Sequence, residues 1–426
     1  MPPTRTTPRS RQHVRWSDLQ GLAQLAAQST VGVANIAEGV HANVLRTLQL
    51  PVGQGPDAGR TRGLTGFVYR SVRGIARVAG AGSQAVLSRL PGGDPHASSP
   101  QREAALAALN GVLGDQLAAN GNPLATAMAF YQDGQRVDPT QPPADANGKI
   151  LLLLHGLCMN DLQWRAHGHD HGQVLADALG HTRLYLRYNT GRHVSDNGAD
   201  LAALLQQLAH HWPTPVEEIT VVAHSMGGLV TRSACAAAEA AGLTWRGLLR
   251  RIVFLGTPHH GAPLEKAGHW ADVLLGQTRW TAPFARLGHI RSAGITDLRH
   301  GQVQPADHAD HDRFNGSHAD TRHPLPLPQG VACFALAATT AESATPPRAD
   351  HWHPALVGDG LVPVRSALGE HDDPAMQLDF PAERRCVLAG VNHMALLHAP
   401  AVTGQLMAWL APGADAKPRK SRQKAR

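Results

Sequence analysis

VVAHSMGGLV, residues 221–230, is the segment from which we predict the fold of this chain. The short apolar run over residues 219–222 is typical of a buried parallel strand, and a helical pattern follows at once. Because almost no turn separates the two, one residue must adopt a strained backbone and its neighbours must be small. Here Ser225 stands between Ala223 and Gly227. This A-x-S-x-G pattern predicts a nucleophile elbow, and a serine that caps a helix is the plainer alternative.

The composition is that of a globular protein without a membrane span. The chain has 426 residues, of which 42% are hydrophobic, enough for one large α/β domain with an appended segment. The basic N-terminus leads into no apolar run, and no run of 18 apolar residues occurs, so we expect neither a secretory signal nor a transmembrane helix. The cysteines follow no metal-type spacing, which predicts a reduced, cytoplasmic chain: Cys158, Cys235, Cys333 and Cys386.

The positive net charge is concentrated in the tail KPRKSRQKAR, residues 417–426. The whole chain carries a formal net charge of +6, and the tail alone contains six Lys and Arg residues. Short basic tails are usually disordered and solvated, whereas contact with anionic lipid or nucleic acid is the alternative. No aromatic residues are interleaved with these charges, so we expect no nucleic-acid partner.

The sequence pattern of residues 1–125 predicts a helical N-terminal region. Apolar residues recur at three- and four-residue intervals over residues 18–48 and 62–90, as in amphipathic helices. We predict that these helices pack on the main domain. A membrane-surface role is the alternative, because the second helix has a basic face, formed by Arg62, Arg70, Arg73, Arg77 and Arg89.

From residue 149 onward, strand and helix patterns alternate, which predicts a doubly wound, mostly parallel α/β sheet. We assign residues 126–411 to this domain, with a cap insertion at about 262–330, and residues 412–426 to a disordered tail. Strands are expected at 149–156, 182–189, 219–224, 250–258, 330–339 and 384–390, and helices at about 161–179, 197–212, 227–242 and 395–410.

Two residues downstream of Ser225 have the setting of a base and its orienting acid. A serine nucleophile needs a histidine base held by a carboxylate, in the chain order serine, acid, histidine. Asp359 lies between two glycines in a tight loop, and His393 lies between the last strand and the last helix. We predict the triad Ser225, Asp359 and His393. Asp297 is an alternative acid, and a structural role for His393 is also open.

An oxyanion intermediate would need two backbone donors near the serine. One is the N–H of Met226, at the positive end of the helix that follows the elbow. The other should come from the loop after the strand LLLLHG, where we favour Leu157 and keep Cys158 as the alternative.

Taken together, LLLLHGL, VVAHSMGG, FLGTPHHGAP, GDGLVPV and NHMALL resemble the α/β-hydrolase superfamily. They are most similar to its lipase and esterase branch, which includes bacterial triacylglycerol lipases and the hydrolase domain of GPI inositol-deacylases. The resemblance covers residues 149–411 and implies the same triad and the donors Leu157 and Met226. Ala223 departs from the glycine of many members, and residues 1–125 lie outside the resemblance.

The resemblance implies a serine hydrolase that cleaves carboxylic esters, lipid-like ones in particular, through an acyl-enzyme and without a cofactor. Its partner would be a small-molecule or lipid ester, and peripheral membrane contact stays open. Two alternatives remain: a catalytically idle hydrolase fold that binds a membrane or a protein, and a thioesterase or amidase.

Other polar clusters invite a metal interpretation, which we do not favour. Residues 307–323 are rich in His and Asp, residue types that suit zinc, but their breaker-rich sequence predicts a solvated insertion, as does that of residues 166–172. His259 and His260 precede Asp359 in the sequence, so we expect structural or pocket-wall roles for them.

The insertion also carries an apolar cluster at helical spacing, which would be either a lid or the core of a cap: Trp270, Val273, Leu274, Trp280 and Phe284.

Overall fold

The computed structural model describes residues 15, 17–28, 98–262, 292–308, 320, 322–342 and 358–411. The chain divides into two compact units, one of residues 1–102 and 117–125, the other of residues 103–116 and 126–426. The predicted basic helix face, the apolar cluster of the insertion and the basic tail lie outside the described residues. The predicted domain boundaries and the packing of the N-terminal region therefore stay predictions.

The first unit contains a helix over residues 17–28, the beginning of α3 (Pro100–Ala119) and the segment after it. Arg102 forms an ion pair with Asp18 at 2.5 Å, and the Asn122 side-chain amide donates to the carbonyl of Gly21 at 3.1 Å. These contacts join segments that are about a hundred residues apart in the sequence. Only the first part of the predicted helix 18–48 is described, and it is helical.

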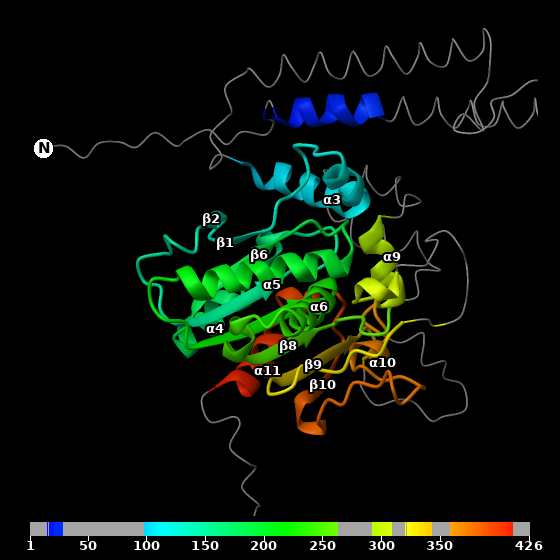
Figure 1. The fold of residues 1–426 in the computed structure, drawn as a ribbon. Coiled ribbons are helices and arrows are strands. Elements are labelled where there is room, and N and C mark those ends of the chain that lie inside the picture. Colours follow the sequence, from blue (N-terminus) through cyan, green and yellow to red (C-terminus); the bar gives the residue numbers. More distant parts are fainter. Residues whose placement is uncertain are drawn as a thin grey trace, which may run out of the picture. The chain divides into compact units, whose positions relative to one another are not determined.

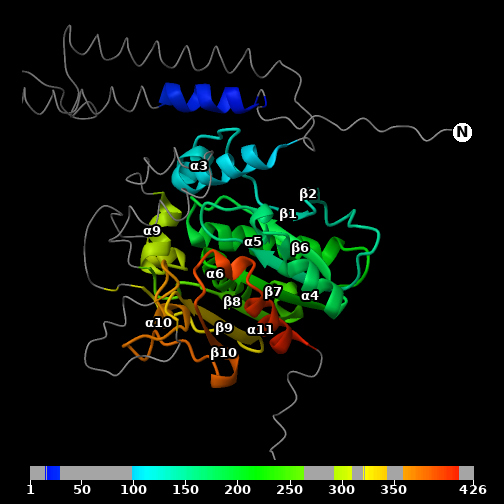
Figure 2. The ribbon, with the colours of Figure 1, turned by 180° about the vertical axis from the view of Figure 1, so that it is seen from behind.

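The second unit is built on one eight-stranded sheet in the order β10-β9-β8-β7-β3-β6-β1-β2, with β2 and β10 at its two ends (Figure 1 and Figure 2). β1 is antiparallel to both of its neighbours, and the other neighbouring pairs are parallel. The strands are β1 (Ala129–Gln132), β2 (Gln135–Val137), β3 (Lys149–Leu154), β6 (Thr182–Arg187), β7 (Glu218–His224), β8 (Leu249–Leu255), β9 (Ala332–Thr339) and β10 (Arg385–Ala389).

The central strands are apolar on both faces, as expected where helices cover both sides of a parallel sheet. All residues of β3 from Ile150 to Leu154 are fully buried. Leu152 lies beside Leu184 of β6 and Val221 of β7 in the strand register. This continuous burial explains why the strands show unbroken apolar runs instead of alternation.

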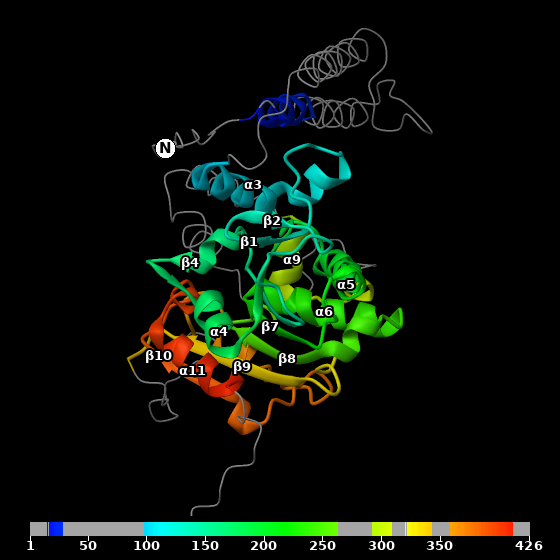
Figure 3. The same ribbon diagram turned by 90° about the vertical axis from the view of Figure 1, so that its left-hand side faces the viewer.

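Helices line both faces of the sheet. Figure 3 shows α5 (Val194–His211) and α6 (Met226–Ala240) together on one side, with α4 (His171–Leu179) and α11 (Pro400–Leu410) together on the other. An eight-stranded, mostly parallel α/β sheet flanked by helices confirms the predicted fold class. None of the helices in the described part of the chain is long and apolar enough to span a bilayer.

Two predicted helices are wrong in part. The segment 161–179 forms a 3₁₀ helix (Asp161–Trp164), a small hairpin of β4 (Arg165–Ala166) and β5 (His169–Asp170), and only then α4. Gly168, at φ +76°, allows the hairpin turn that interrupts the helix. The closing helix 395–410 is likewise broken, because Pro400 lacks an N–H and starts α11 anew.

The β1–β2 hairpin and a 3₁₀ turn (Pro305–Asp307) inside the insertion were not predicted from the sequence. α3 lies in the region of residues 1–125 that was predicted to be helical, and α9 (Ala293–His300) forms where helical spacing surrounds Asp297 in the predicted insertion.

Candidate active site

The carboxyl ends of the parallel strands meet at one edge of the sheet, where ligands of such folds bind. β7 ends at His224 and continues directly into Ser225, β8 ends at Leu255, and β10 ends four residues before His393. The loop of Asp359 joins the end of β9, since the Thr340 N–H donates to the carbonyl of Gly358 at 3.0 Å. The three predicted triad residues therefore share this edge.

Ser225 adopts the backbone of an elbow. Its φ of 54° and ψ of −124° are strained for a residue with a side chain, and its hydroxyl makes no capping bond to α6. The Ser225 N–H donates to the carbonyl of Leu255 at 2.8 Å. A Cβ atom at Gly227 would lie 2.8 Å from the carbonyl oxygen of His155, so only glycine fits there. The helix-cap alternative is not what the geometry shows.

Asp359 and His393 form a buried pair. Nδ1 of His393 lies 2.7 Å from Oδ2 of Asp359, and both side chains are 1% exposed. The other carboxylate oxygen, Oδ1, accepts the N–H groups of Leu361 at 3.0 Å and Val362 at 2.8 Å. Asp359 thus uses one oxygen to anchor itself in its own turn and the other to hold the imidazole.

Tight contacts bring this pair to the Ser225 end of β7. The carbonyl of His393 lies 3.0 Å from Nε2 of His224, the residue before Ser225. A Cβ atom at Gly256, directly after β8, would lie 3.0 Å from Oδ2 of Asp359 and 3.3 Å from Cε1 of His393. Nε2 of His393 is buried and makes no hydrogen bond within the described residues. This nitrogen is therefore available as a proton acceptor.

Two further histidines under the site are held neutral. Burial lowers the pKa of His155 to about 3 and places the pKa of His224 well below its usual range. The Tyr188 ring stacks on His155 at 4.4 Å, and its hydroxyl donates to the His155 carbonyl at 2.8 Å. These groups bring no charge to the site. Neither histidine was assigned a role from the sequence, because a buried histidine leaves no pattern there.

The loop after β3 runs close to Ser225. A Cβ atom at Gly156 would lie 3.0 Å from Cβ of Ser225. The N–H of Cys158 donates to Oγ1 of Thr190 at 3.1 Å, so this N–H is engaged by the protein itself. Among the described residues, the N–H groups of Leu157 and Met226 have no such acceptor. Burial also raises the pKa of the Cys158 thiol to about 12, which keeps it protonated.

Asp297 lies elsewhere and has a structural role. It is buried on α9, and its carboxylate accepts the N–H of Val194 at 2.8 Å and contacts Nδ1 of His193 at 3.1 Å. It therefore caps the beginning of α5, whose first N–H groups lack partners within the helix.

The polar segments 307–323 and 166–172, which we predicted to be solvated, contain buried residues. Asp307 is 1% exposed and accepts the backbone N–H groups of Val303, Gln304 and His323, so a solvated role is wrong for this residue. Asp320 instead pairs with Arg322. Nε2 of His308 contacts Oγ of Ser195 at 2.9 Å, and Nδ1 of His323 lies 3.3 Å from Asp307. The members between residues 309 and 319 lie outside the described residues. In the part of the chain that the structure describes, no group of His, Cys, Asp and Glu is arranged to hold a metal ion.

The prediction of a solvated role is also wrong for His171, which is buried at the start of α4 and contacts the carbonyl of Leu396 through Nε2 at 3.1 Å.

His259 is fully buried against Phe254 and Phe380, and His260 contacts the carbonyl of Gly369 at 3.1 Å. Both fit the structural role that we expected.

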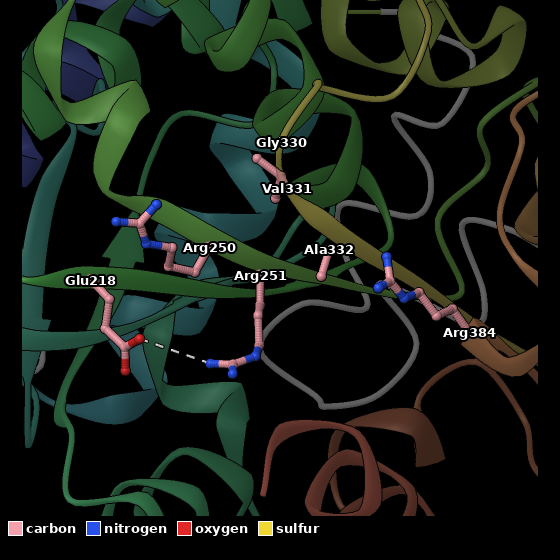
Figure 4. A pocket seen from close by; sticks show the side chains of 7 residues that line it. All are labelled: Glu218, Arg250, Arg251, Gly330, Val331, Ala332 and Arg384. Carbon is pink, nitrogen blue, oxygen red and sulfur yellow. Dashed lines mark ion pairs between the residues drawn. The ribbon is translucent and has the colours of Figure 1, made fainter. Parts of the chain in front are cut away.

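A hollow of about 490 Å³ lies at the opposite edge, where β7, β8 and β9 begin (Figure 4). Glu218, the first residue of β7, lies 3.9 Å from Arg251, and Arg250 and Arg384 also line the hollow. Because Ser225 follows the other end of β7, this hollow is separate from the candidate site.

The chain matches one family model and several solved structures. Residues 124–299 match a family described as a domain of unknown function (DUF7379). No curated protein matches the chain. Among solved structures, the mature lipase BlEst2 of Bacillus licheniformis is 18% identical, with 66% of this chain and 96% of that chain covered and a TM-score of 0.38.

Two other solved structures are similar at the same level. The ester-hydrolase EH1AB1 from the metagenome of Lake Arreo is 13% identical, covering 76% of this chain and 92% of that chain, with a TM-score of 0.36. The type II thioesterase YbtT of the yersiniabactin pathway is 13% identical, with 63% of this chain and 95% of that chain covered and a TM-score of 0.37. The expected resemblance to GPI inositol-deacylases has no support here. Likenesses this remote do not identify a reaction or a substrate.

Proposed function

We propose that the protein is a serine hydrolase that cleaves carboxylic esters. The observation that carries the proposal is the Asp359–His393 pair, buried at the same sheet edge as a serine whose backbone is strained into an elbow. A buried imidazole held by a carboxylate, with its other nitrogen unengaged, is suited to take a proton from a serine hydroxyl.

In the first step, Oγ of Ser225 attacks the ester carbonyl carbon while Nε2 of His393 takes the hydroxyl proton. Asp359 accepts the Nδ1–H bond of the same ring, which fixes the tautomer and stabilises the imidazolium. The tetrahedral intermediate then collapses, and His393 returns the proton to the departing alkoxide. Water attacks the acyl-enzyme in the same way, releasing the acid and regenerating Ser225.

The negative oxygen of each tetrahedral intermediate needs preorganised donors. We assign this role to the N–H groups of Met226, at the start of α6, and Leu157, in the loop after β3. The bond from Cys158 to Thr190 favours Leu157 over Cys158, because an N–H already engaged with a protein acceptor is a poor candidate. The close approach of Gly156 to Ser225 supports the same choice.

Oxygen esters are the proposed substrates, with lipid-like acyl groups as the class to test first. The same triad would act on thioesters or amides, so the bond must be established by experiment. We therefore propose a fluorophosphonate labelling assay, followed by p-nitrophenyl esters of increasing chain length and a matched thioester. Labelling that disappears in Ser225→Ala, together with ester turnover, would support the proposal.

An unlabelled wild-type protein with no turnover of any ester, thioester or amide would contradict it and favour the idle binding module. No cofactor takes part in the proposed steps.

A further inference from the structure

The loop after β3 contains a strained residue that the proposed chemistry does not use. Cys158 has a φ of 59°, in the left-handed region that residues with a side chain seldom adopt, and it is 7% exposed. Such a conformation costs free energy and persists only where the surrounding structure holds it. What holds Cys158 therefore controls the path of the whole loop.

Two groups hold Cys158. The Thr190 hydroxyl oxygen accepts its N–H at 3.1 Å, which fixes the plane of the Leu157–Cys158 peptide. On the other side, the thiol packs against Gly111 of α3, where a Cβ atom would lie 2.2 Å from Sγ. The Thr190 hydroxyl forms a directed hydrogen bond, whereas Gly111 only leaves room for the thiol. Thr190 is therefore the residue that orients the backbone of Cys158.

Thr190 stands on a rigid support. It is 1% exposed, in a loop joined to α3 by a bond from the Asn189 amide to the carbonyl of Gly114 at 2.8 Å. The Asn197 amide of α5 donates to the carbonyl of Asn189 at 2.9 Å. The neighbouring Gly191 leaves no space for a side chain, because a Cβ atom would lie 2.1 Å from a backbone oxygen of α3. The acceptor at Thr190 is thus fixed in place.

The other end of the same short loop meets the nucleophile. Gly156 lies against Cβ of Ser225, and Leu157 is the single residue between Gly156 and the held Cys158. Thr190 fixes one side of Leu157 and Ser225 lies at the other. A relaxation of the Cys158 backbone would move the intervening N–H relative to Ser225.

We propose that Thr190 is a positioning residue for the Leu157 oxyanion donor. This inference rests on the proposed serine hydrolase function. Thr190 does not touch the substrate; its hydroxyl holds Cys158 in the strained backbone that keeps the Leu157 N–H beside Ser225. Without that acceptor, a buried N–H would be left unsatisfied, and the loop would rearrange to pair it.

The test compares two substitutions at this position. Thr190→Val keeps the shape and removes the acceptor, whereas Thr190→Ser keeps the acceptor. Loss of an oxyanion donor lowers kcat by roughly 10²–10³-fold, so we expect Thr190→Val to lower kcat for a short-chain p-nitrophenyl ester at least about tenfold. KM should change by less than about threefold, because the donor acts mainly on the transition state. Thr190→Ser, in contrast, should keep most of the wild-type kcat.

Thr182→Val is a matched control at the opposite edge of the sheet. The buried Thr182 hydroxyl also accepts a backbone N–H, that of Asn147 at 2.7 Å, but at the start of β6. The control should lower the melting temperature and leave kcat near the wild-type value.

An inhibitor separates positioning from general destabilisation. A trifluoromethyl ketone forms a tetrahedral adduct with the serine, so its Ki should rise in Thr190→Val by about the factor by which kcat falls. A folded Thr190→Val enzyme with wild-type kcat and Ki would overturn the inference while leaving the proposed function intact. A wild-type protein that neither turns over esters nor binds the ketone would instead overturn the proposed function. If Thr190→Val does not fold, Thr190→Ala, which also lacks the acceptor, replaces it in the same measurements.

Discussion

Asp359 holds His393 through two hydrogen bonds, one from the ring and one from the backbone. The carboxylate Oδ2 lies 2.7 Å from Nδ1 of the imidazole, and the carbonyl of Asp359 accepts the His393 N–H at 2.9 Å. The side-chain bond fixes the tautomer and the backbone bond fixes the loop that carries the ring. Since both side chains are shielded from water, neither bond competes with solvent.

Asp359→Asn should preserve the fold and lower kcat by about a thousandfold or more, because an amide that donates to Nδ1 favours the wrong tautomer. The measurement is turnover of a short-chain ester, with thermal unfolding as the check of folding. A folded variant with a rate near that of the wild type would place the acid elsewhere.

Asp297→Asn is the matched control for the acid. It should leave kcat per folded molecule within a few-fold of the wild type. It should also lower the free energy of unfolding by about 1–2 kcal/mol, because the carboxylate caps the N–H of Val194 at the start of α5. Urea unfolding measures this free energy. A loss of turnover comparable to that of Asp359→Asn would refute the assignment of roles.

The strained backbone of Ser225 predicts a stability difference between two inactive variants. Ser225→Ala and Ser225→Gly should both abolish fluorophosphonate labelling. Only glycine relieves the positive φ, so Ser225→Gly should be the more stable by about 1 kcal/mol. Thermal melts of both proteins provide the comparison. Equal stabilities would argue against strain at the elbow, and labelling of either variant would remove Ser225 as the sole nucleophile.

Gly227→Ala should damage the elbow, although alanine is the better helix former. Its Cβ atom would lie 2.8 Å from the carbonyl oxygen of His155 and 2.9 Å from Leu154, so the strand or the helix must shift. We expect a loss of stability of about 1–3 kcal/mol and of most activity. Gly404→Ala, in α11, is the control. With nothing within 4 Å of its Cβ position, it should stabilise the protein by about 0.5–1 kcal/mol. A change in stability of the same sign in Gly227→Ala and Gly404→Ala would contradict the close packing at Gly227.

Acid should destabilise the protein through its buried histidines. Burial lowers the pKa of His155 to about 3 from an ordinary value near 6.5, so below pH 6.5 the unfolded chain binds more protons than the folded one. The stability is therefore complete above about pH 6.5 and is lost as the pH falls from there toward 3. Each such group contributes a slope of up to about 1.4 kcal/mol per pH unit.

His155→Asn tests this slope, because asparagine can still donate to the carbonyl that Nδ1 contacts but does not titrate. Urea unfolding between pH 7.5 and 4.5 should give a shallower dependence for this variant than for the wild type. Equal slopes for His155→Asn and the wild type would show that His155 is not the titrating group.

The sheet and the elbow could be predicted from the amino-acid sequence alone. Unbroken apolar runs such as that of β3 require helices on both faces, and a strand that passes into a helix without a turn requires strain at one residue, Ser225. Both features depend only on neighbours in the sequence, so the order of residues is sufficient to predict them. The interruption of helix 161–179 was missed because the turn places both His167 and Gly168 at positive φ, within a pattern that otherwise fits a helix.

The tertiary structure alone decided between candidates that the sequence order allows equally. Asp297 and Asp359 both lie between Ser225 and His393 in the chain, yet one caps α5 and the other reaches the imidazole. Hydrogen-bond partners depend on which loops the order of the strands brings together. That order pairs residues separated by tens of positions, as it does for Asp359 and His393, and no local pattern records it.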